Sequence, residues 1–272
     1  MRRLPAPAKL NLSLVVGPRR DDGKHEVATV LQRISLADRV SIQPAAALDV
    51  RGFAEDTLVR DALLQLAEAA GAEARWSVRI EKQIPVAAGL GGGSSDAATA
   101  LRLANETLDE PLEPEPLSEL AARLGADVPS FLVAGPQLGE GDGSELSPVE
   151  LPQDYWVLVV LARDAAKSST GAVYEQFDER GGEEGFEERR AALLDTLAEI
   201  RRPRDLARLP ANDLASSPLA AELRSLGAFR ADVTGAGPAV YGLFHHRLQA
   251  AAAARSLRAR GRTWVCVPTW YV

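Results

Sequence analysis

A glycine-rich run at residues 85–96 has the clearest chemistry in this sequence. It reads Pro-Val-Ala-Ala-Gly-Leu-Gly-Gly-Gly-Ser-Ser-Asp. Closely spaced glycines let several backbone N–H groups converge on one anion, and a helix that follows adds unpaired N–H groups and the positive end of its dipole. The run therefore predicts a phosphate-binding loop. The residues expected to form it are Pro85, Val86, Ala87, Ala88, Gly89, Leu90, Gly91, Gly92, Gly93, Ser94 and Ser95.

Two common phosphate-binding patterns do not match this run. The P-loop pattern requires a lysine after the glycines, where this chain has Ser94 and Ser95. The dinucleotide pattern requires a third glycine where Ser94 stands. One alternative stays open, a flexible glycine turn whose serines and aspartate cap a helix.

The elements around the run can position such a loop. Trp76, Val78 and Ile80 alternate with polar residues and predict a strand before it, and residues 97–108 favour a helix after it. A second alternation over residues 10–16 predicts a strand that opens the fold, with Lys9 at its start. The order strand, loop, helix suits a phosphate site.

The remaining pattern predicts mixed α+β structure without an internal repeat. Residues 136–155 are rich in turn-forming residues, so we expect a boundary there, with domains at 1–150 and 151–272. The tract 178–190 is nearly all polar and predicts a solvated, mobile loop that leads into a helix. Further strands are expected at 27–36, 40–42, 157–162, within 231–244 and at 263–267, the last closing the chain, and further helices at 58–70, 117–124 and 247–260.

Composition narrows the classes of protein. The chain has 272 residues, 46% of them apolar, and a net charge of −7, which argues against nucleic-acid or anionic-lipid partners. A single cysteine, Cys266, excludes an internal disulfide, and the three histidines show no metal-ligand spacing. Since neither a signal peptide nor a membrane span is recognisable, we expect a cytoplasmic protein.

Four further segments accompany the glycine run in a recognisable order. They are Ala6–Leu12, Asp22–Glu26, Leu124–Phe131 and Thr234–Pro238. Together with the run, they make the chain resemble the GHMP kinase superfamily, which includes galactokinase, homoserine kinase and mevalonate kinase. The resemblance covers nearly the whole chain, and it is strongest to the superfamily branch that serves the non-mevalonate isoprenoid pathway.

This resemblance implies a fold and a reaction. The expected fold has an N-terminal domain like ribosomal protein S5 domain 2 and a ferredoxin-like C-terminal domain, with the active site between them. The expected reaction transfers phosphate from ATP, with Mg²⁺, to the 2-hydroxyl of a cytidine diphosphate-linked methylerythritol. A kinase for another small alcohol, or a catalytically silent binding protein of this fold, stays open as an alternative.

The resemblance also implies two catalytic residues. Asp127 matches the family's catalytic aspartate, although its position before Val128-Pro129 also suits a helix N-cap. Lys9 matches a lysine that contacts that aspartate and the reacting groups, although a lysine at a strand end is more commonly a solvated charge. Ser94 or Ser95 is expected to help place Mg²⁺.

The substrate residues follow from the same resemblance. They are Asn11, His25, Tyr174, Thr234 and Gly235. His25 could instead be a surface imidazole, Tyr174 could pack a helix, and Thr234 and Gly235 could form a tight turn between strands. In close relatives an aromatic residue precedes the histidine and stacks on the cytosine, whereas this chain has Lys24 there.

Overall fold

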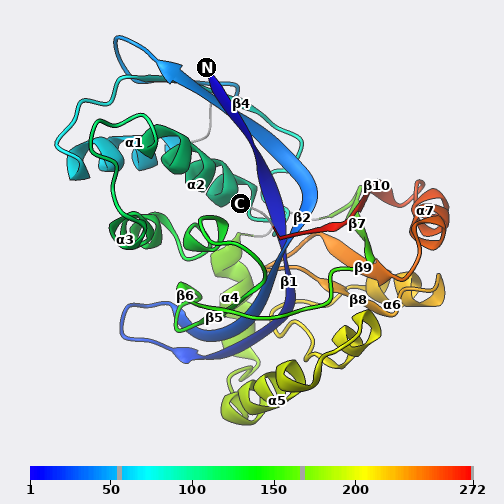
Figure 1. Cartoon of the computed structure of the whole chain (residues 1–272). Coiled ribbons are helices and arrows are strands. Elements are labelled where there is room, and N and C mark those ends of the chain that lie inside the picture. Colours follow the sequence, from blue (N-terminus) through cyan, green and yellow to red (C-terminus); the bar gives the residue numbers. More distant parts are fainter. Residues whose placement is uncertain (54–56, 166–168, 271–272) are drawn as a thin grey trace.

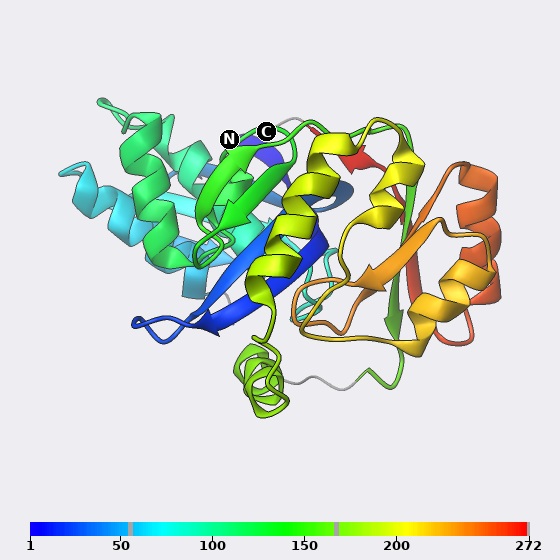
Figure 2. The ribbon, with the colours of Figure 1, turned by 90° about the horizontal axis from the view of Figure 1, so that it is seen from below.

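Two β-sheets lie side by side in the computed structural model, which describes residues 1–53, 57–165 and 169–270. Figure 1 shows a long, twisted N-terminal hairpin that runs through the first sheet. Figure 2, seen from below, shows the second sheet and its helices next to this hairpin. The hairpin therefore connects the two parts of the molecule.

The first sheet has seven strands arranged around that antiparallel hairpin. Its first strand extends beyond the predicted 10–16 on both sides, and residues 8–17 are buried without alternation. The order is β3-β4-β2-β5-β6, and β1 and β11 also pair with β2. The strands are β1 (Arg2–Arg19), β2 (His25–Pro44), β3 (Asp49–Arg51), β4 (Trp76–Glu81), β5 (Gln137–Glu140), β6 (Glu145–Pro148) and β11 (Pro268–Thr269).

Three helices cover one face of this sheet (Figure 1). They are α1 (Thr57–Ala69), α2 (Gly92–Asn105) and α3 (Pro114–Leu124). Their apolar residues share one core with β2 and β4. α1 ends just before Gly71, whose φ of 61° is a left-handed conformation that glycine adopts readily.

The second sheet has four strands in the order β10-β7-β9-β8. The strands are β7 (Trp156–Ala162), β8 (Arg230–Val233), β9 (Val240–Phe244) and β10 (Gly261–Cys266). Two helices, α6 (Pro218–Ser225) and α7 (Arg247–Ser256), pack on it through a core that includes Leu158, Val160 and Phe244. β7 is buried along most of its length, in agreement with its continuous apolar run.

Two further helices and two 3₁₀ turns lie between these strands. They are η1 (Pro129–Phe131), α4 (Thr170–Glu179), α5 (Phe186–Glu199) and η2 (Pro203–Arg208). η1 precedes β5, and α4, α5 and η2 lie between β7 and β8. The tract at 178–190 is the end of α4, a mostly exposed turn and the start of α5. The expected solvated segment leading into a helix is thus confirmed, although it is shorter than predicted. Phe186 is buried against Gly17 of β1, and this single apolar residue anchors the tract.

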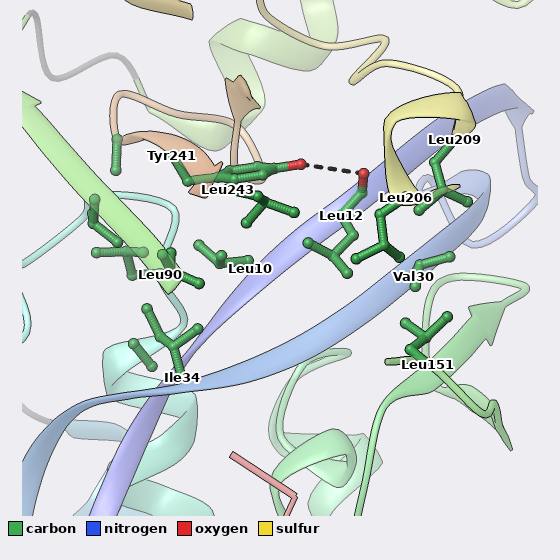
Figure 3. Packing of buried hydrophobic residues seen from close by; sticks show 14 of the residues in the cluster. Leu10, Leu12, Val30, Ile34, Leu90, Leu151, Leu206, Leu209, Tyr241 and Leu243 are labelled. Carbon is green, nitrogen blue, oxygen red and sulfur yellow. Dashed lines mark hydrogen bonds between the residues drawn. The ribbon is translucent and has the colours of Figure 1, made fainter. Parts of the chain in front are cut away.

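The two sheets share a hydrophobic core (Figure 3). Leu10 and Leu12 of β1 pack with Tyr241 and Leu243 of β9 and with Leu206 of η2. The Tyr241 hydroxyl donates a hydrogen bond of 3.2 Å to the backbone oxygen of Leu12, so this buried polar group is satisfied within the core. Because the sheets bury apolar surface against each other, their relative position is set by packing.

Other expectations have mixed outcomes. The strands at 10–16, 27–36, 76–80 and 157–162 are confirmed. The turn-rich segment 136–155 contains the β5–β6 hairpin. The strand expected at 263–267 is β10, but it does not close the chain, because β11 follows it. β1 to β6 lie before residue 150 and β7 to β10 after it, while β11 returns to the first sheet; the domain boundary at 150/151 stays a prediction.

Within the three described ranges, no helix is both long and apolar enough to cross a bilayer.

Candidate active site

A cavity lies where β1, the glycine run and the turn after β8 meet. We call it the central cavity; its volume is about 560 Å³, and its lining includes Lys9, Asn11, Asp127, Ser94 and Gly235. Side chains and backbone from both halves of the chain contribute to it. Such a concave site with convergent polar groups is the usual setting of an active site.

Lys9 is held at this cavity by the strand that carries it. It lies inside β1 opposite Arg33, not at the strand's start, and its N–H donates to the backbone oxygen of Leu90, 3.0 Å away. Its side chain is only 5% exposed, so the alternative of a solvated charge is wrong. The ammonium donates to Asn11 Oδ1 at 2.6 Å and lies 3.3 Å from Asp127 Oδ2.

Asp127 reaches the cavity from the short turn before η1. The side chain is 39% exposed, so it can meet a ligand while Lys9 stays buried beside it. η1 has three residues, its N-cap position is Val128, and it has no side-chain cap. The alternative in which Asp127 caps a helix is therefore wrong. Because a buried ammonium needs a partner charge, Lys9 and Asp127 stabilise each other there.

Asn11 links this pair to the C-terminal half of the chain. Its backbone N–H donates to Thr234 Oγ1 at 3.0 Å, and its side-chain amide donates to Thr29 Oγ1 at 2.7 Å. The Thr29 hydroxyl in turn donates to the Ser13 backbone oxygen at 2.8 Å. With its hydrogen-bonding groups satisfied in this way, Asn11 holds one orientation, and its oxygen faces Lys9.

The glycines of the loop allow close backbone approach. Gly89 has a φ of 80°, and a Cβ placed there would collide with the backbone oxygen of Thr234. Gly91 has a φ of 68°, and its added Cβ would lie 2.9 Å from Lys9 Cγ. Ala87 also has a positive φ, 52°, which is unfavourable for a residue with a side chain. The loop is thus fitted against Lys9 and the turn after β8, which carries Gly235.

The helix that follows the loop begins earlier than the sequence predicts, at Gly92. Gly91 occupies the N-cap position of α2 without a side-chain cap, so the glycine turn with a Ser/Asp cap is not what the structure shows. An uncapped N-terminus of a 14-residue helix leaves N–H groups and the positive dipole end at the cavity. Ser94 lines the cavity, and the Ser95 hydroxyl is buried without a hydrogen-bond partner in the described structure.

A second cavity continues along the loop. This glycine-loop cavity, about 330 Å³, is lined by residues 85–94 with Phe53, Leu58 and Lys82. Lys82 Nζ lies 2.6 Å from Asp38 Oδ2 and 2.7 Å from Asp96 Oδ2, and both carboxylates are fully buried. Burial opposes the charged ammonium, but the two carboxylates outweigh it and raise the pKa of Lys82.

These contacts fasten both ends of the glycine loop. Lys82 follows β4 just before the loop, and Asp96 is the fifth residue of α2, just after it. Asp38 of β2 also accepts hydrogen bonds from the backbone N–H groups of Gln83 and Ile84. The three charges therefore tie the loop to the first sheet.

A third cavity adjoins the central one. This α4 cavity, about 350 Å³, is lined by Lys24, His25, Asp142, Tyr174 and others, and it shares Asp142 and Tyr174 with the central cavity. His25 is buried, so the alternative of a surface imidazole is wrong; its ring nitrogen lies 2.7 Å from Asp178 Oδ1. The rings of His25 and Tyr174 stack with centroids 4.7 Å apart.

The structure therefore brings the expected site residues to three connected cavities. Lys9, Asn11, Asp127 and Gly235 line the central cavity, and Thr234 lies directly behind it. Four residues that sequence reasoning missed also face these cavities or support the site, namely Thr29, Lys82, Asp142 and Asp178. Only Lys82 had a local signal, its position between a predicted strand and the glycine run.

Family comparisons agree with this arrangement. The model of the GHMP kinases N terminal domain matches residues 57–135, and that of the GHMP kinases C terminal matches residues 184–263. The chain belongs to the GHMP kinase family, with the two-domain α+β fold of that family.

The chain's relatives point to one branch of that family. A 4-diphosphocytidyl-2-C-methyl-D-erythritol kinase from Nocardia farcinica is 39% identical, with 94% of this chain and 89% of the relative covered. The protein of the same name from Syntrophotalea carbinolica is 35% identical, with 96% of this chain and 95% of the relative covered. This chain is therefore a kinase of the family, similar over nearly its whole length to the 4-diphosphocytidyl-2-C-methyl-D-erythritol kinases.

Solved structures agree with the sequence comparison. A crystal structure of 4-(cytidine 5'-diphospho)-2C-methyl-D-erythritol kinase matches with a TM-score of 0.80 and 31% identity over 98% of this chain and 99% of that one. A crystal structure of mevalonate kinase has a TM-score of 0.77 at 14% identity, with 99% of each chain covered, and shares the fold.

Proposed function

We propose that this protein transfers the γ-phosphoryl group of ATP to the 2-hydroxyl of 4-diphosphocytidyl-2-C-methyl-D-erythritol. The observation that carries the proposal is the Lys9–Asp127 pair, which faces the same cavity as the glycine loop. The names of the full-length relatives support this choice of substrate. Phosphoryl transfer depends mainly on positioning and on charge stabilisation, and this site offers both.

In this proposal Asp127 accepts the proton of the attacking hydroxyl. The oxygen then forms a bond to the γ-phosphorus while the bond from that phosphorus to the β,γ-bridging oxygen breaks, and ADP leaves with the electron pair. Lys9 offsets negative charge that grows near Asp127. Asn11 keeps the Lys9 ammonium in place through their 2.6 Å hydrogen bond.

The glycine loop and α2 would hold the nucleotide phosphates. Their backbone N–H groups and the positive end of α2 face the glycine-loop cavity, which continues into the central cavity through Gly89, Gly91 and Ser94. Lys82 offsets the charges of Asp38 and Asp96, which would otherwise repel a polyphosphate from below the loop.

The residues at the start of α2 fit a magnesium ion. Ser95 has a buried hydroxyl without a partner in the described structure, and Ser94 lines the cavity beside it. Either hydroxyl would hold Mg²⁺ together with substrate phosphates, as is usual for this ion, which takes few protein ligands in such sites. When bound, the ion neutralises charge on the phosphate oxygens.

The α4 cavity would take the cytidine end of the substrate, with His25 and Tyr174 among its walls. A coupled assay of ADP release tests the whole proposal, with the cytidine substrate compared against mevalonate, homoserine and galactose. We expect turnover with the cytidine substrate alone. Turnover with another alcohol would assign a different acceptor, and no turnover with any would indicate a catalytically silent protein.

A further inference from the structure

Lys24 directly precedes His25, and its ammonium contacts a carboxylate from another turn of the first sheet. It lies in the turn between β1 and β2, and its ammonium forms an ion pair with Asp142 in the turn between β5 and β6. Both residues line the α4 cavity. The Asp142 side chain is only 13% exposed, whereas that of Lys24 is 53% exposed.

The aromatic rings of this cavity leave no slot for a base between them. A base inserted between two rings needs about 7 Å, twice the ~3.5 Å contact distance of carbon atoms. The centroids of His25 and Tyr174 are 4.7 Å apart and their planes differ by 27°. His25 and Tyr174 therefore cannot hold a base between them, and a ring alone stacks on any base, so the polar walls of the cavity must distinguish one base from another.

The Asp142 carboxylate is built as a hydrogen-bond acceptor. Its Oδ1 accepts from the Ser144 backbone N–H at 3.1 Å and from the Ser144 hydroxyl at 2.6 Å, while Oδ2 meets Lys24. A carboxylate has about four acceptor positions, so one remains for a ligand. Burial opposes its charge, but the hydrogen bonds from Lys24 and Ser144 dominate and lower the pKa of Asp142 to about 2. The group therefore stays ionised and cannot donate.

We propose that Asp142, held in place by Lys24, determines base specificity by accepting a hydrogen bond from the exocyclic amine of an aminopyrimidine. This inference rests on the proposed function, because it takes the α4 cavity as the site of the cytidine. A uracil at the same place would present a carbonyl oxygen to the carboxylate and leave two acceptors facing each other. Sites built for one hydrogen-bonding group reject ligands that lack it.

The test compares two commercial probes, cytidine 5'-diphosphate and uridine 5'-diphosphate, by titration calorimetry. Wild-type protein should prefer the cytidine probe by at least about tenfold, equal to ~1.4 kcal/mol. Asp142→Asn presents an amide that can also donate, so the ratio of the two dissociation constants should fall by about tenfold. An unchanged ratio in Asp142→Asn, or no preference in wild type, overturns the inference.

Three further variants sharpen this comparison. Glu175→Gln makes the same carboxylate-to-amide change at another wall of the α4 cavity, so an equal loss of preference there would overturn the inference. Lys24→Met keeps the carboxylate but removes the ion pair that holds it, so the preference should fall, and by less than in Asp142→Asn; a preference equal to that of wild type would refute the positioning role of Lys24. If Asp142→Asn does not fold, Asp142→Ser preserves turn-forming ability and should likewise lose the preference.

The assay of ADP release separates this inference from the proposed function. Turnover with the cytidine substrate, together with an unchanged preference in Asp142→Asn, leaves the proposed function standing and refutes the role of Asp142. Preferential binding of the cytidine probe without any turnover refutes the kinase reaction while the role of Asp142 stands.

Discussion

The ammonium of Lys9 lies 3.3 Å from Asp127 Oδ2, and Lys9 is buried while Asp127 is partly exposed. The two residues come from the middle of a sheet strand and from a turn beyond α3. This asymmetry places a fixed positive charge behind a carboxylate that a substrate can reach. Such a pair suits proton acceptance next to a transferring phosphoryl group.

Replacing Asp127 by asparagine should preserve the fold and abolish most turnover. The amide keeps the shape of the side chain but cannot accept the substrate proton, so kcat should fall by about 10²-fold or more. The measurement is kcat by ADP release, with melting temperature as the check on folding. Asp109→Asn, at an exposed position away from the cavities, is the matched control. A kcat near that of wild type would leave Asp127 without a catalytic role.

Gly91→Val should raise the KM for ATP and lower kcat together. A β-branched residue is strained at a φ of 68°, and its Cβ would press on Lys9 Cγ at 2.9 Å. Gly93→Ala, on the same loop with no atom near an added Cβ, should have a smaller effect than Gly91→Ala. Calorimetry of nucleotide binding compares the two alanine variants. Equal losses of affinity in Gly91→Ala and Gly93→Ala would contradict the expected close contact at Gly91.

Lys82→Met should destabilise the protein and weaken nucleotide binding. The variant leaves Asp38 and Asp96 buried beside each other without their shared cation, a change of about 3–5 kcal/mol in the free energy of unfolding. Arg3→Met, which removes an exposed ion pair with Glu81, should cost at most about 1 kcal/mol. Urea unfolding measures both, and similar losses would contradict the expected role of Lys82.

Asp142 should make stability depend on pH in the acid range. The pKa of its carboxyl is about 2 in the folded protein and about 3.8 when unperturbed, so the unfolded chain binds the proton first as pH falls. Its contribution is therefore present above about pH 4 and is lost as pH falls toward 2. The stability difference between wild type and Asp142→Asn, about 1 kcal/mol at pH 6 after screening of the exposed Lys24, should shrink by pH 3. A constant difference in urea unfolding would exclude this linkage.

Tyr174→Ala should weaken binding of the cytidine substrate while ATP binding barely changes. The loss of an aromatic platform typically costs about 1–3 kcal/mol, and here it also removes the ring that stacks on His25. Tyr174→Phe retains the ring and should bind nearly as wild type. KM values for both substrates measure the effect. A variant with lower melting temperature and unchanged KM would make Tyr174 a core residue only.

The local features of this protein could be read from its sequence. The strand before the glycine loop, the glycines with left-handed φ values and the helix after them are contiguous, and each depends on neighbouring residues. The motifs around Lys9, Asp127 and Thr234 were recognisable for the same reason. Periodicity also predicted most strands, because alternation reports which side of a strand is buried.

Contacts between distant segments were decided by the tertiary structure. The pairing of β1 with β2 shifts register between Pro7 and Ala8 and again between Asn11 and Ser13, and such irregularities carry no simple sequence signal. They determine which strand positions face the cavities, and so the burial of Lys9. Lys24 and Asp142, and likewise Lys82 and Asp38, meet only because separate turns and strands pack at one place. Their types were readable from the sequence, but their partners depend on sheet register and on the core shared by the two sheets.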